Sequence, residues 1–445
     1  MGTADTYDVI VAGGGASGLI AGIAAARQGM RTLIIERAAC FGGTATSAYV
    51  AQYVGFFNGN TQAVWGTPYE LTRRVTAAGG GEGFSQYTMG EATGHPTLIR
   101  NFPFNPEIVK MIADEMVVEA GADALFHTLI TGVIADGEQI KGVIVEGIDG
   151  RREIAAKVVI DATGDAVVAK HAGITVEGEE EELRNARQPQ SMIFRLANVD
   201  LPRFRALSRE EKTALAVEGV KSGEIYWQSL SFIGVPGTTD VVCFMSRIQG
   251  LDALNPDDLT QTEIIGRKQV RTIVPFLKRR VPGFEKCHLT TIAARAGIRE
   301  TRRIDGQYTL TGEDVMSSRS FPDSIALGCG PVDLHDAKSA SIFLEMPPAP
   351  FEIPMRCLLP KTVEGLIVTG RTISATREAN GGARHMATAM ALGEAAGVMS
   401  AVSVSENCST LEIPAELVRE RLRKSGAAVT AADCARLSET APRPM

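Results

Sequence analysis

The chain has 445 residues, of which 44% are hydrophobic and 22% charged, with 46 glycines and a net charge of −7. This composition is typical of a globular α/β protein of about two domains, and the negative charge argues against nucleic acid as the main partner. The seven cysteines are scattered without a C-x-x-C pair, which favours a reducing, cytoplasmic setting and argues against a disulfide framework or a metal site.

The N-terminal segment predicts one βαβ unit. Residues 7–12 read as a buried parallel strand, residues 16–28 as a helix closed by Gly29, and residues 32–36 as a second strand. The turn between the first strand and the helix carries the pattern G-x-G-x-x-G, which is typical of a site for a dinucleotide.

Each glycine of that pattern has its own expected task. Gly13 makes the tight turn, Gly15 lets the backbone approach a pyrophosphate, and Gly18 lets the helix pack closely on the strand. Glu36 closes the second strand, where an acid binds a ribose hydroxyl and repels a 2′-phosphate. The ligand should therefore be FAD or NAD; an ordinary glycine-rich turn is the alternative.

The next segments predict a helix and a meander. A helix is expected to begin at Asn105-Pro106 and to end at Gly121. Hairpin turns separate expected strands at residues 129–135, 140–146 and 152–156, and a buried strand with the sequence "KVVIDATGDA" follows.

The second half of the chain is less regular. The acidic run at residues 177–182 indicates a surface boundary. Beyond it we expect strands at 229–233 and 241–245 and a helix at 259–280. A buried strand at 364–370 then precedes a long helix of small residues; because residues 386–404 include Glu394, we expect a buried helix and no membrane span.

Three further segments suggest which dinucleotide binds: "ERAACFGGTAT" at 36–46, "DATGD" at 161–165 and "GLIVTGRTISATREANGGARHMATAMALGEAAG" at 365–397. With them the chain resembles the FAD-dependent oxidoreductases of the glutathione reductase superfamily. It is most similar to the branch that includes fumarate reductase and succinate dehydrogenase flavoproteins and many single-chain bacterial oxidoreductases. The resemblance covers roughly residues 5–60, 105–175 and 350–400 and extends to 297–315 and 352–361.

The resemblance implies an α/β fold: a Rossmann-like FAD-binding domain with three-layer ββα architecture and an inserted α+β substrate or cap domain. The expected boundaries are 1–60, 105–175 and 321–405 for the discontinuous FAD-binding domain, 61–104 and 176–320 for the cap domain, and 406–445 for a C-terminal helical tail.

The same resemblance implies the FAD contacts position by position. The pyrophosphate would meet Gly13, Gly15, Ala16, Ser17 and Gly18, and the adenosine would meet Glu36, Arg37 and the backbone of Ile130. Gly42, Gly43 and Thr44 would pass near the pyrophosphate and flavin, and Ala162, Thr163, Gly164 and Asp165 would close over the ribose and phosphate. Gly370 and Arg371 would reach the ribityl–phosphate region, and the helix from Met386 would point its amino end at the flavin pyrimidine.

The expected catalytic groups are His335, Arg384 and His385. When flavin N5 takes a hydride from a substrate carbon, the proton on the substrate's oxygen or nitrogen needs an acceptor. A substrate with a carboxylate needs an arginine to bind it. The alternatives are a core or capping role for His385 and an inert turn position for His335. Arg299, Arg302 and Arg303 are expected to form ion pairs with Glu300 and Asp305 at the domain junction; the alternative is that they clamp an anion.

The expected function is hydride transfer between flavin N5 and a small polar organic molecule, such as an alcohol, amine or organic acid. FAD should be bound non-covalently, because the histidine-linked flavin motif of the resembling branch is not matched. No second G-x-G-x-x-G follows a strand, so oxygen, a quinone or a carrier protein is the expected electron acceptor. There are two alternatives: a flavin-dependent isomerase or hydratase without net redox chemistry, and a binding protein that has lost the flavin. The sequence leaves the oligomeric state open.

Overall fold

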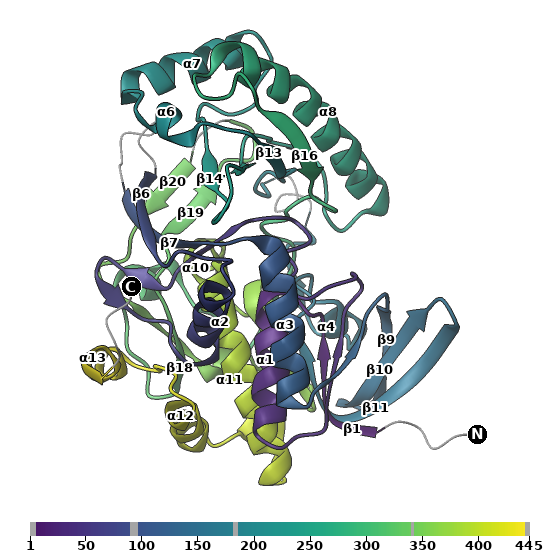
Figure 1. Cartoon of the computed structure of the whole chain (residues 1–445). Coiled ribbons are helices and arrows are strands. Elements are labelled where there is room, and N and C mark those ends of the chain that lie inside the picture. Colours follow the sequence, from purple (N-terminus) through teal and green to yellow (C-terminus); the bar gives the residue numbers. More distant parts are fainter. Residues whose placement is uncertain (1–5, 90–96, 181–185, 340–341, 441–445) are drawn as a thin grey trace.

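The computed structural model describes residues 6–89, 97–180, 186–339 and 342–440. Its lower lobe in Figure 1 is built on a sheet with the order β8-β2-β1-β11-β10-β9, with β22 paired to β11. These strands are β1 Thr6–Ala12, β2 Thr32–Ile35, β8 Asp123–Leu125, β9 Leu129–Asp136, β10 Gln139–Gly147, β11 Gly150–Asp161 and β22 Leu366–Val368. The pairs β1–β2, β1–β11, β2–β8 and β11–β22 are all parallel, which confirms the predicted α/β fold with a Rossmann-like core.

Side chains of β1 alternate between two cores, which makes three layers. Val9 and Val11 point into the core that contains the helices, whereas Ile10 packs in a second core with Val143 and Val145 of the meander. The parallel part of the sheet (β8, β2, β1, the second half of β11 and β22) therefore has helices on one face, and the antiparallel arm of the same sheet, β9 and β10, packs on the other.

One expectation about β11 was wrong. The sequence suggested a hairpin arm at 152–156 and a separate buried strand after it, but the structure has one continuous strand of 12 residues. Its first half pairs with β10 (Arg152 opposite Val145) and its second half with β1 (Val158 opposite Val9). No turn is needed between the two halves, because the same extended strand leaves its pairing with β10 and continues beside β1.

The helical layer contains α1 Ala16–Arg27, α2 Gly66–Ala77, α3 Pro106–Ala120 and α11 Met386–Ser405. Asn105 caps α3 by accepting from the Glu107 amide, and Gly121 ends it in the left-handed region, as predicted. Within the described part of the chain, α11 alone has the length and apolar character of a membrane span, and 89% of its most apolar window is buried inside the protein.

The upper lobe has its own antiparallel sheet, in the order β14-β15-β13-β16, covered by three helices. The elements are β13 Phe194–Ala197, α6 Leu201–Arg205, α7 Arg209–Lys221, β14 Phe232–Gly234, β15 Val241–Cys243, α8 Pro256–Arg280 and β16 His288–Ile292. The helix expected at 259–280 is α8, and the strands expected at 229–233 and 241–245 are β14 and β15, both shorter than expected. Residues 181–182 of the acidic run lie outside the described residues.

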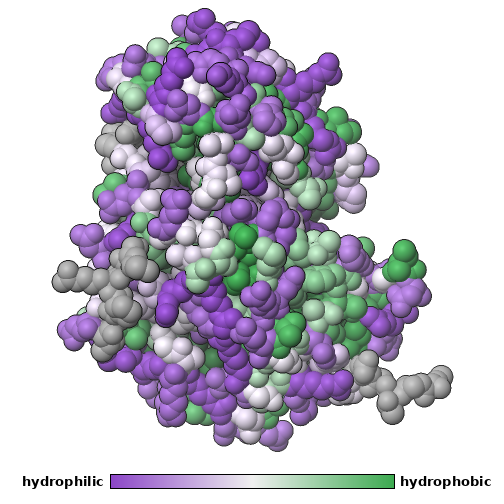
Figure 2. Space-filling model, viewed as in Figure 1, coloured by the Kyte–Doolittle hydropathy of each residue, from purple (hydrophilic) through white to green (hydrophobic). Residues whose placement is uncertain are grey.

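Short sheets lie between the lobes and carry part of the site (Figure 1). They are β3 Gln52–Val54, β6 Ser85–Met89 and β7 Thr97–Pro103 in one sheet, and β19 Val332–His335 with β20 Ile342–Glu345 in another. The remaining elements are β4 Phe57–Asn58, β5 Thr61–Gln62, α4 Val167–His171, β12 Val176–Glu177, β17 Arg303–Ile304, α9 Gly312–Met316, β18 Ser324–Gly328, β21 Phe351–Pro354, α10 Arg377–Ala383, α12 Ala415–Lys424 and α13 Ala431–Thr440. Figure 2 shows a narrower waist between the lobes and a largely hydrophilic outer surface.

Candidate active site

A cavity of 1710 Å³ runs between the two lobes, from the turn after β1 to the sheet of the upper lobe. Pockets for a single small ligand usually measure about 300–1,000 Å³. The volume is thus sufficient for a dinucleotide together with a second molecule.

The cavity brings together most of the residues that the sequence singled out. Its lining includes Gly15, Ala16, Ser17, Arg37, Gly43, Thr44, Ala162, Thr163, Gly164, Gly370, Arg371, Met386, His335, Arg384 and His385. Six others are not among the lining residues: Gly13, Gly18, Glu36, Gly42, Ile130 and Asp165.

The glycines of the first turn differ in what surrounds them. A Cβ at Gly18 would overlap the Gly13 carbonyl oxygen, and one at Gly13 would lie 2.6 Å from the Ala162 carbonyl oxygen. At Gly15 an added Cβ would meet no protein atom within 4 Å, and φ is an ordinary −65°. The protein itself has no steric need for glycine at position 15, so the open space at the amino end of α1 fits a diphosphate.

Glu36 is held firmly at the end of β2. Its two carboxylate oxygens accept from the amides of Gly14 and Ala38, each at 2.8 Å. Ile130 is half-buried in β9, where it pairs with Val145. Neither residue is part of the cavity lining, and Glu36 lies beside the turn through its contact with Gly14.

Arg371 joins three segments of the chain. Its Nη2 pairs with an Asp165 oxygen at 2.9 Å, its Nε donates to the Gly164 carbonyl at 2.6 Å, and its Nη1 donates to the Ile298 carbonyl at 2.6 Å. Burial opposes ionisation of Asp165, but Arg371 and Arg37 outweigh it and lower the pKa of this carboxyl. This network fixes the turn after β11 against the segment that follows β16.

Arg295 is a cavity residue that the sequence reasoning missed. Its Nη2 lies 3.6 Å from the position of a Cβ on Gly43, beside the turn that holds Gly15. Burial and the neighbouring Arg37 lower the pKa of this guanidinium. Within the described residues its side chain makes no ion pair, so a positive charge faces the space proposed for the diphosphate.

His385 presents one open nitrogen to the cavity. Its Nε2 lies 2.8 Å from the Pro331 carbonyl oxygen and must carry the hydrogen, because a carbonyl only accepts. Nδ1 is then unprotonated and accepts no hydrogen bond from the described residues. Burial lowers the pKa of His385 to about 4, so the ring is neutral at pH 7. Gly330 leaves room for the ring, since a Cβ there would overlap it.

His335 has both ring nitrogens occupied. Nδ1 lies 3.3 Å from Arg247 Nη1, which can only donate, and Nε2 lies 3.3 Å from Asp333 Oδ1. Burial lowers the pKa of His335 to about 4. The neutral ring therefore links Arg247 to Asp333, and no lone pair remains free.

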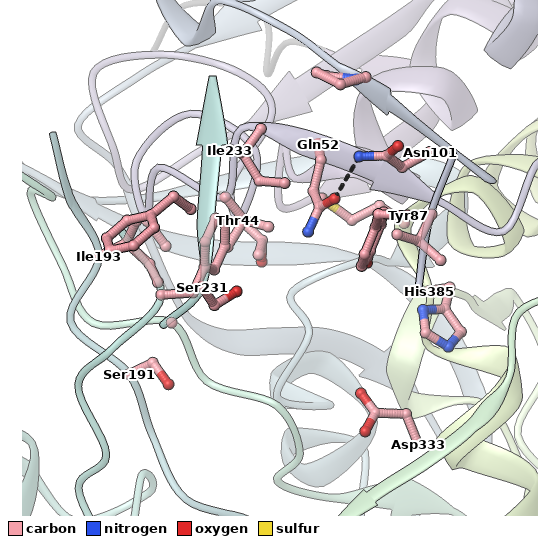
Figure 3. A pocket seen from close by; sticks show the side chains of 18 of the residues that line it. Thr44, Gln52, Tyr87, Asn101, Ser191, Ile193, Ser231, Ile233, Asp333 and His385 are labelled. Atoms are coloured by element: carbon pink, nitrogen blue, oxygen red, sulfur yellow. Dashed lines mark hydrogen bonds between the residues drawn. The ribbon is translucent and has the colours of Figure 1, made fainter. Parts of the chain in front are cut away.

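Asp333 and Tyr87 were also missed. Asp333 stands two positions before His335 on β19, and its Oδ2 pairs with Arg384 at 3.2 Å. Burial opposes ionisation, but His335 and Arg384 outweigh it and lower the pKa of Asp333. Tyr87 projects from β6 towards His385, and its hydroxyl is hydrogen-bonded to Gln52, which accepts from Asn101 at 2.7 Å (Figure 3). The two-residue spacing on a strand could have pointed to Asp333; no local pattern indicates Tyr87.

Comparisons with known proteins identify the family. A family model described as FAD dependent oxidoreductase matches residues 8–422. No curated protein matches the chain. Among solved structures it is similar to a geranylgeranyl bacteriochlorophyll reductase-like protein from Thermoplasma acidophilum (15% identity, TM-score 0.48, 98% of this chain and 87% of that chain). It is also similar to p-nitrophenol 4-monooxygenase from Pseudomonas putida DLL-E4 (11%, 0.48, 98% and 93%) and to L-proline dehydrogenase from P. horikoshii (13%, 0.42, 96% and 100%).

These structural likenesses are too distant to bear on the reaction. The family match spans nearly the whole chain, and the open position at Gly15 fits the diphosphate of the family's cofactor. The chain therefore belongs to the FAD dependent oxidoreductase family and is an enzyme whose cofactor is FAD.

Proposed function

We propose that this enzyme transfers a hydride between flavin N5 and a small polar organic substrate, such as an alcohol, an amine or an organic acid. The observation that carries the proposal is one continuous cavity, whose lining includes both the open turn at Gly15 and His385, the residue with the unprotonated Nδ1. The sequence resemblance to the fumarate reductase and succinate dehydrogenase branch agrees with this reaction type.

Most of the residues that would hold FAD line the cavity, and Glu36 lies next to that lining at Gly14. The amides of Gly15, Ala16 and Ser17 at the start of α1 would bind the diphosphate, with Arg295 adding a positive charge across from them. Glu36 would hold the adenosine ribose, and the amino end of α11 at Met386 would stabilise negative charge on the ring. Non-covalent binding is proposed for this cofactor.

The substrate would react beside His385. When bound, FAD supplies the acceptor for the hydride that the substrate carbon loses as its C–H bond breaks. The proton on the substrate oxygen or nitrogen passes to His385 Nδ1, which leaves a C=O or C=N product. Oxygen, a quinone or a carrier protein would accept the two electrons that the substrate gives up.

His335 and Asp333 would act on this step indirectly. Asp333 pairs with Arg384, which directly precedes His385, and His335 Nε2 lies 3.3 Å from the second oxygen of Asp333. We assign His335 as a positioning residue, because its Nδ1 faces Arg247 and its Nε2 carries the ring hydrogen. Closure of the cavity between the lobes would limit water at the reacting atoms.

An anaerobic screen tests the proposal. Alcohols, amines and organic acids are mixed with the FAD-loaded protein, and loss of the flavin's visible absorption is recorded. At least one class should bleach the flavin in the wild type, and His385→Gln should bleach far more slowly with unchanged FAD content. A flavin that no donor bleaches, or equal rates in the two proteins, would contradict the proposal.

A further inference from the structure

Three arginines converge on one end of the cavity; we call Arg247, Arg299 and Arg384 the arginine cluster. Only Arg384 faces a carboxylate, at 3.2 Å from Asp333 Oδ2. Arg247 donates to the carbonyls of Asp336 (2.7 Å) and Ser339 (2.6 Å) and contacts His335. Arg299 donates to the Pro189 carbonyl and, at 3.0 Å, to Ser191 Oγ.

Two of the three guanidinium groups thus have only neutral partners. Neither Arg247 nor Arg299 forms an ion pair within the part of the chain that the structure describes. The nearby Glu300 is already occupied, because it accepts from Gln188 and lies 3.6 Å from Arg377. Burial lowers the pKa of Arg247. Asp336 is close enough to act in the opposite direction, but its exposed carboxylate forms no ion pair with this arginine and accepts from two loop amides.

This excess of positive charge is costly without an anion. Burial lowers the pKa of Arg299 to about 10, and the neighbouring Arg384 acts in the same direction. Asp333 and Glu300 act in the opposite direction, but neither forms an ion pair with Arg299. The group is still charged at pH 7, and a desolvated charge without a paired counter-ion destabilises a protein. A chain with net charge −7 nevertheless keeps three cations together here.

The wall on the other side of the cavity is apolar. Ile193 and Ile233 project from the upper lobe and face Tyr87, His385 and Asp333 across the cavity (Figure 3). Further apolar side chains of the same lobe line this wall, and they are only partly buried by protein: Leu230, Phe232 and Phe244. The wall therefore offers apolar surface that another molecule can cover.

We propose that the substrate is an amphipathic carboxylate, with its carboxylate bound by the arginine cluster and its apolar body against the Ile193–Ile233 wall. This inference rests on the proposed function and narrows it to one substrate class. An amphipathic carboxylate fits this cavity better than a small dicarboxylate does, because the second carboxylate of a dicarboxylate would have to lie against the apolar wall. Arg299 is the central ligand, because it stands beside both other arginines and Ser191.

Calorimetric titration of the FAD-loaded protein with carboxylates and their neutral amides tests the inference without turnover. Benzoate and hexanoate are compared with benzamide and hexanamide, and succinate serves as the dicarboxylate. At least one monocarboxylate should bind saturably and about tenfold or more tighter than its amide and than succinate, as expected for a hydrogen-bonded charge pair.

Variants assign the binding to the cluster. Arg299→Gln should weaken the bound monocarboxylate by roughly ten- to a hundredfold. The matched control is Arg205→Gln, an exposed arginine that lines the far end of the same cavity, which should change affinity less than twofold. FAD content and melting temperature are checked for each, and Arg299→Lys, which keeps the charge, should keep the preference for carboxylate over amide.

Three results would overturn the inference: no saturable binding by either monocarboxylate, equal affinity for the amides, or tighter binding of succinate. An Arg299→Gln protein with a lowered flavin potential and unchanged carboxylate affinity would also overturn it, because the cluster would then serve the flavin alone. A flavin that no donor bleaches would count against the proposed function only, since these titrations do not require turnover.

Discussion

Gly15 and Gly18 are three residues apart, yet an added methyl group would meet different surroundings at each. At Gly18 it would overlap the Gly13 carbonyl oxygen inside the protein, whereas at Gly15 it would enter the open cavity. The sequence pattern predicted both tasks, because the G-x-G-x-x-G geometry is local to one turn. At this scale the structure adds the distinction between a glycine that packs against the protein backbone and a glycine that faces open space.

This distinction gives a paired prediction. Gly15→Ala should leave the melting temperature of the FAD-free protein unchanged and weaken FAD binding by roughly ten- to a hundredfold, because displacing the diphosphate costs at least one charge-assisted hydrogen bond. Gly18→Ala should lower the melting temperature even without FAD. Fluorescence titration and circular dichroism measure the two effects, and a destabilised Gly15→Ala apoprotein would contradict the assignment.

The pH dependence of flavin reduction tests His385. The neutral ring is the form that accepts a proton, and burial lowers its pKa from 6.5 to about 4. The reduction rate should therefore be level from about pH 8 to pH 5 and fall only as the pH approaches 4. Stopped-flow absorbance measures the rate. An inflection near 6.5, the ordinary pKa of histidine, would contradict the lowered pKa of His385.

Arg295 makes a third prediction at this scale. Arg295→Gln removes the unpaired cation beside Gly43 and should raise the Kd for FAD by roughly tenfold or more. Arg267→Gln is the control, because Arg267 is exposed on α8 and pairs with Glu263. An unchanged Kd in the Arg295 variant would remove this residue from the diphosphate site.

At the scale of elements, α11 shows what composition can predict. Its small residues indicated a buried helix, and the structure packs Gly393 and Gly397 against α1, where a Cβ would overlap Ser17 and Ala21 backbone oxygens. Local signals also located α3 from its Asn105 cap and Gly121 end. The continuous β11 was missed because its change of partner depends on strands far away in the sequence.

Glu394 of α11 holds a second helix in place. Its carboxylate accepts from the Thr67 amide at 3.1 Å and the Thr67 hydroxyl at 2.8 Å, at the first turn of α2. Burial outweighs these contacts and raises the pKa from 4.5 to about 7. The folded state therefore favours the protonated form, and this contribution to stability is complete below pH 4.5 and is lost as the pH rises through 7.

Glu394→Gln should remove that dependence. The difference in melting temperature, variant minus wild type, should be larger at pH 8 than at pH 5. The reason is that Glu394 ionises in the buried site at pH 8 and Gln cannot. Glu420→Gln, at an exposed position on α12, should shift neither value. If the melting temperatures of Glu394→Gln and wild type differ by the same amount at both pH values, the raised pKa of Glu394 is contradicted.

At the scale of the whole molecule, the site is made from segments that only the fold brings together. Gly15, Tyr87, Arg295, Asp333 and His385 come from five separate stretches of the chain and line one cavity. The G-x-G-x-x-G pattern and Glu36 pointed to a cofactor site because they belong to one local βαβ unit. They could not predict Tyr87 or Arg295, whose roles depend on contacts between distant segments.

The division into domains stays a prediction. The two lobes have separate cores, one around the parallel sheet and one around the β13–β16 sheet. The segment 61–104, expected in the cap, contains α2, whose residues pack in the core of the lower lobe. Boundaries between interleaved segments of this kind depend on packing and carry little local signal.

Single-turnover flavin reduction tests the account most directly. The donor that bleaches the flavin is prepared with hydrogen or deuterium on the reacting carbon and mixed anaerobically with the FAD-loaded protein. We expect the deuterated donor to reduce the flavin markedly more slowly, and His385→Gln to slow both donors by about 10²–10⁴-fold. Equal rates for the two donors, or a His385→Gln protein as fast as the wild type, would contradict hydride transfer at this site.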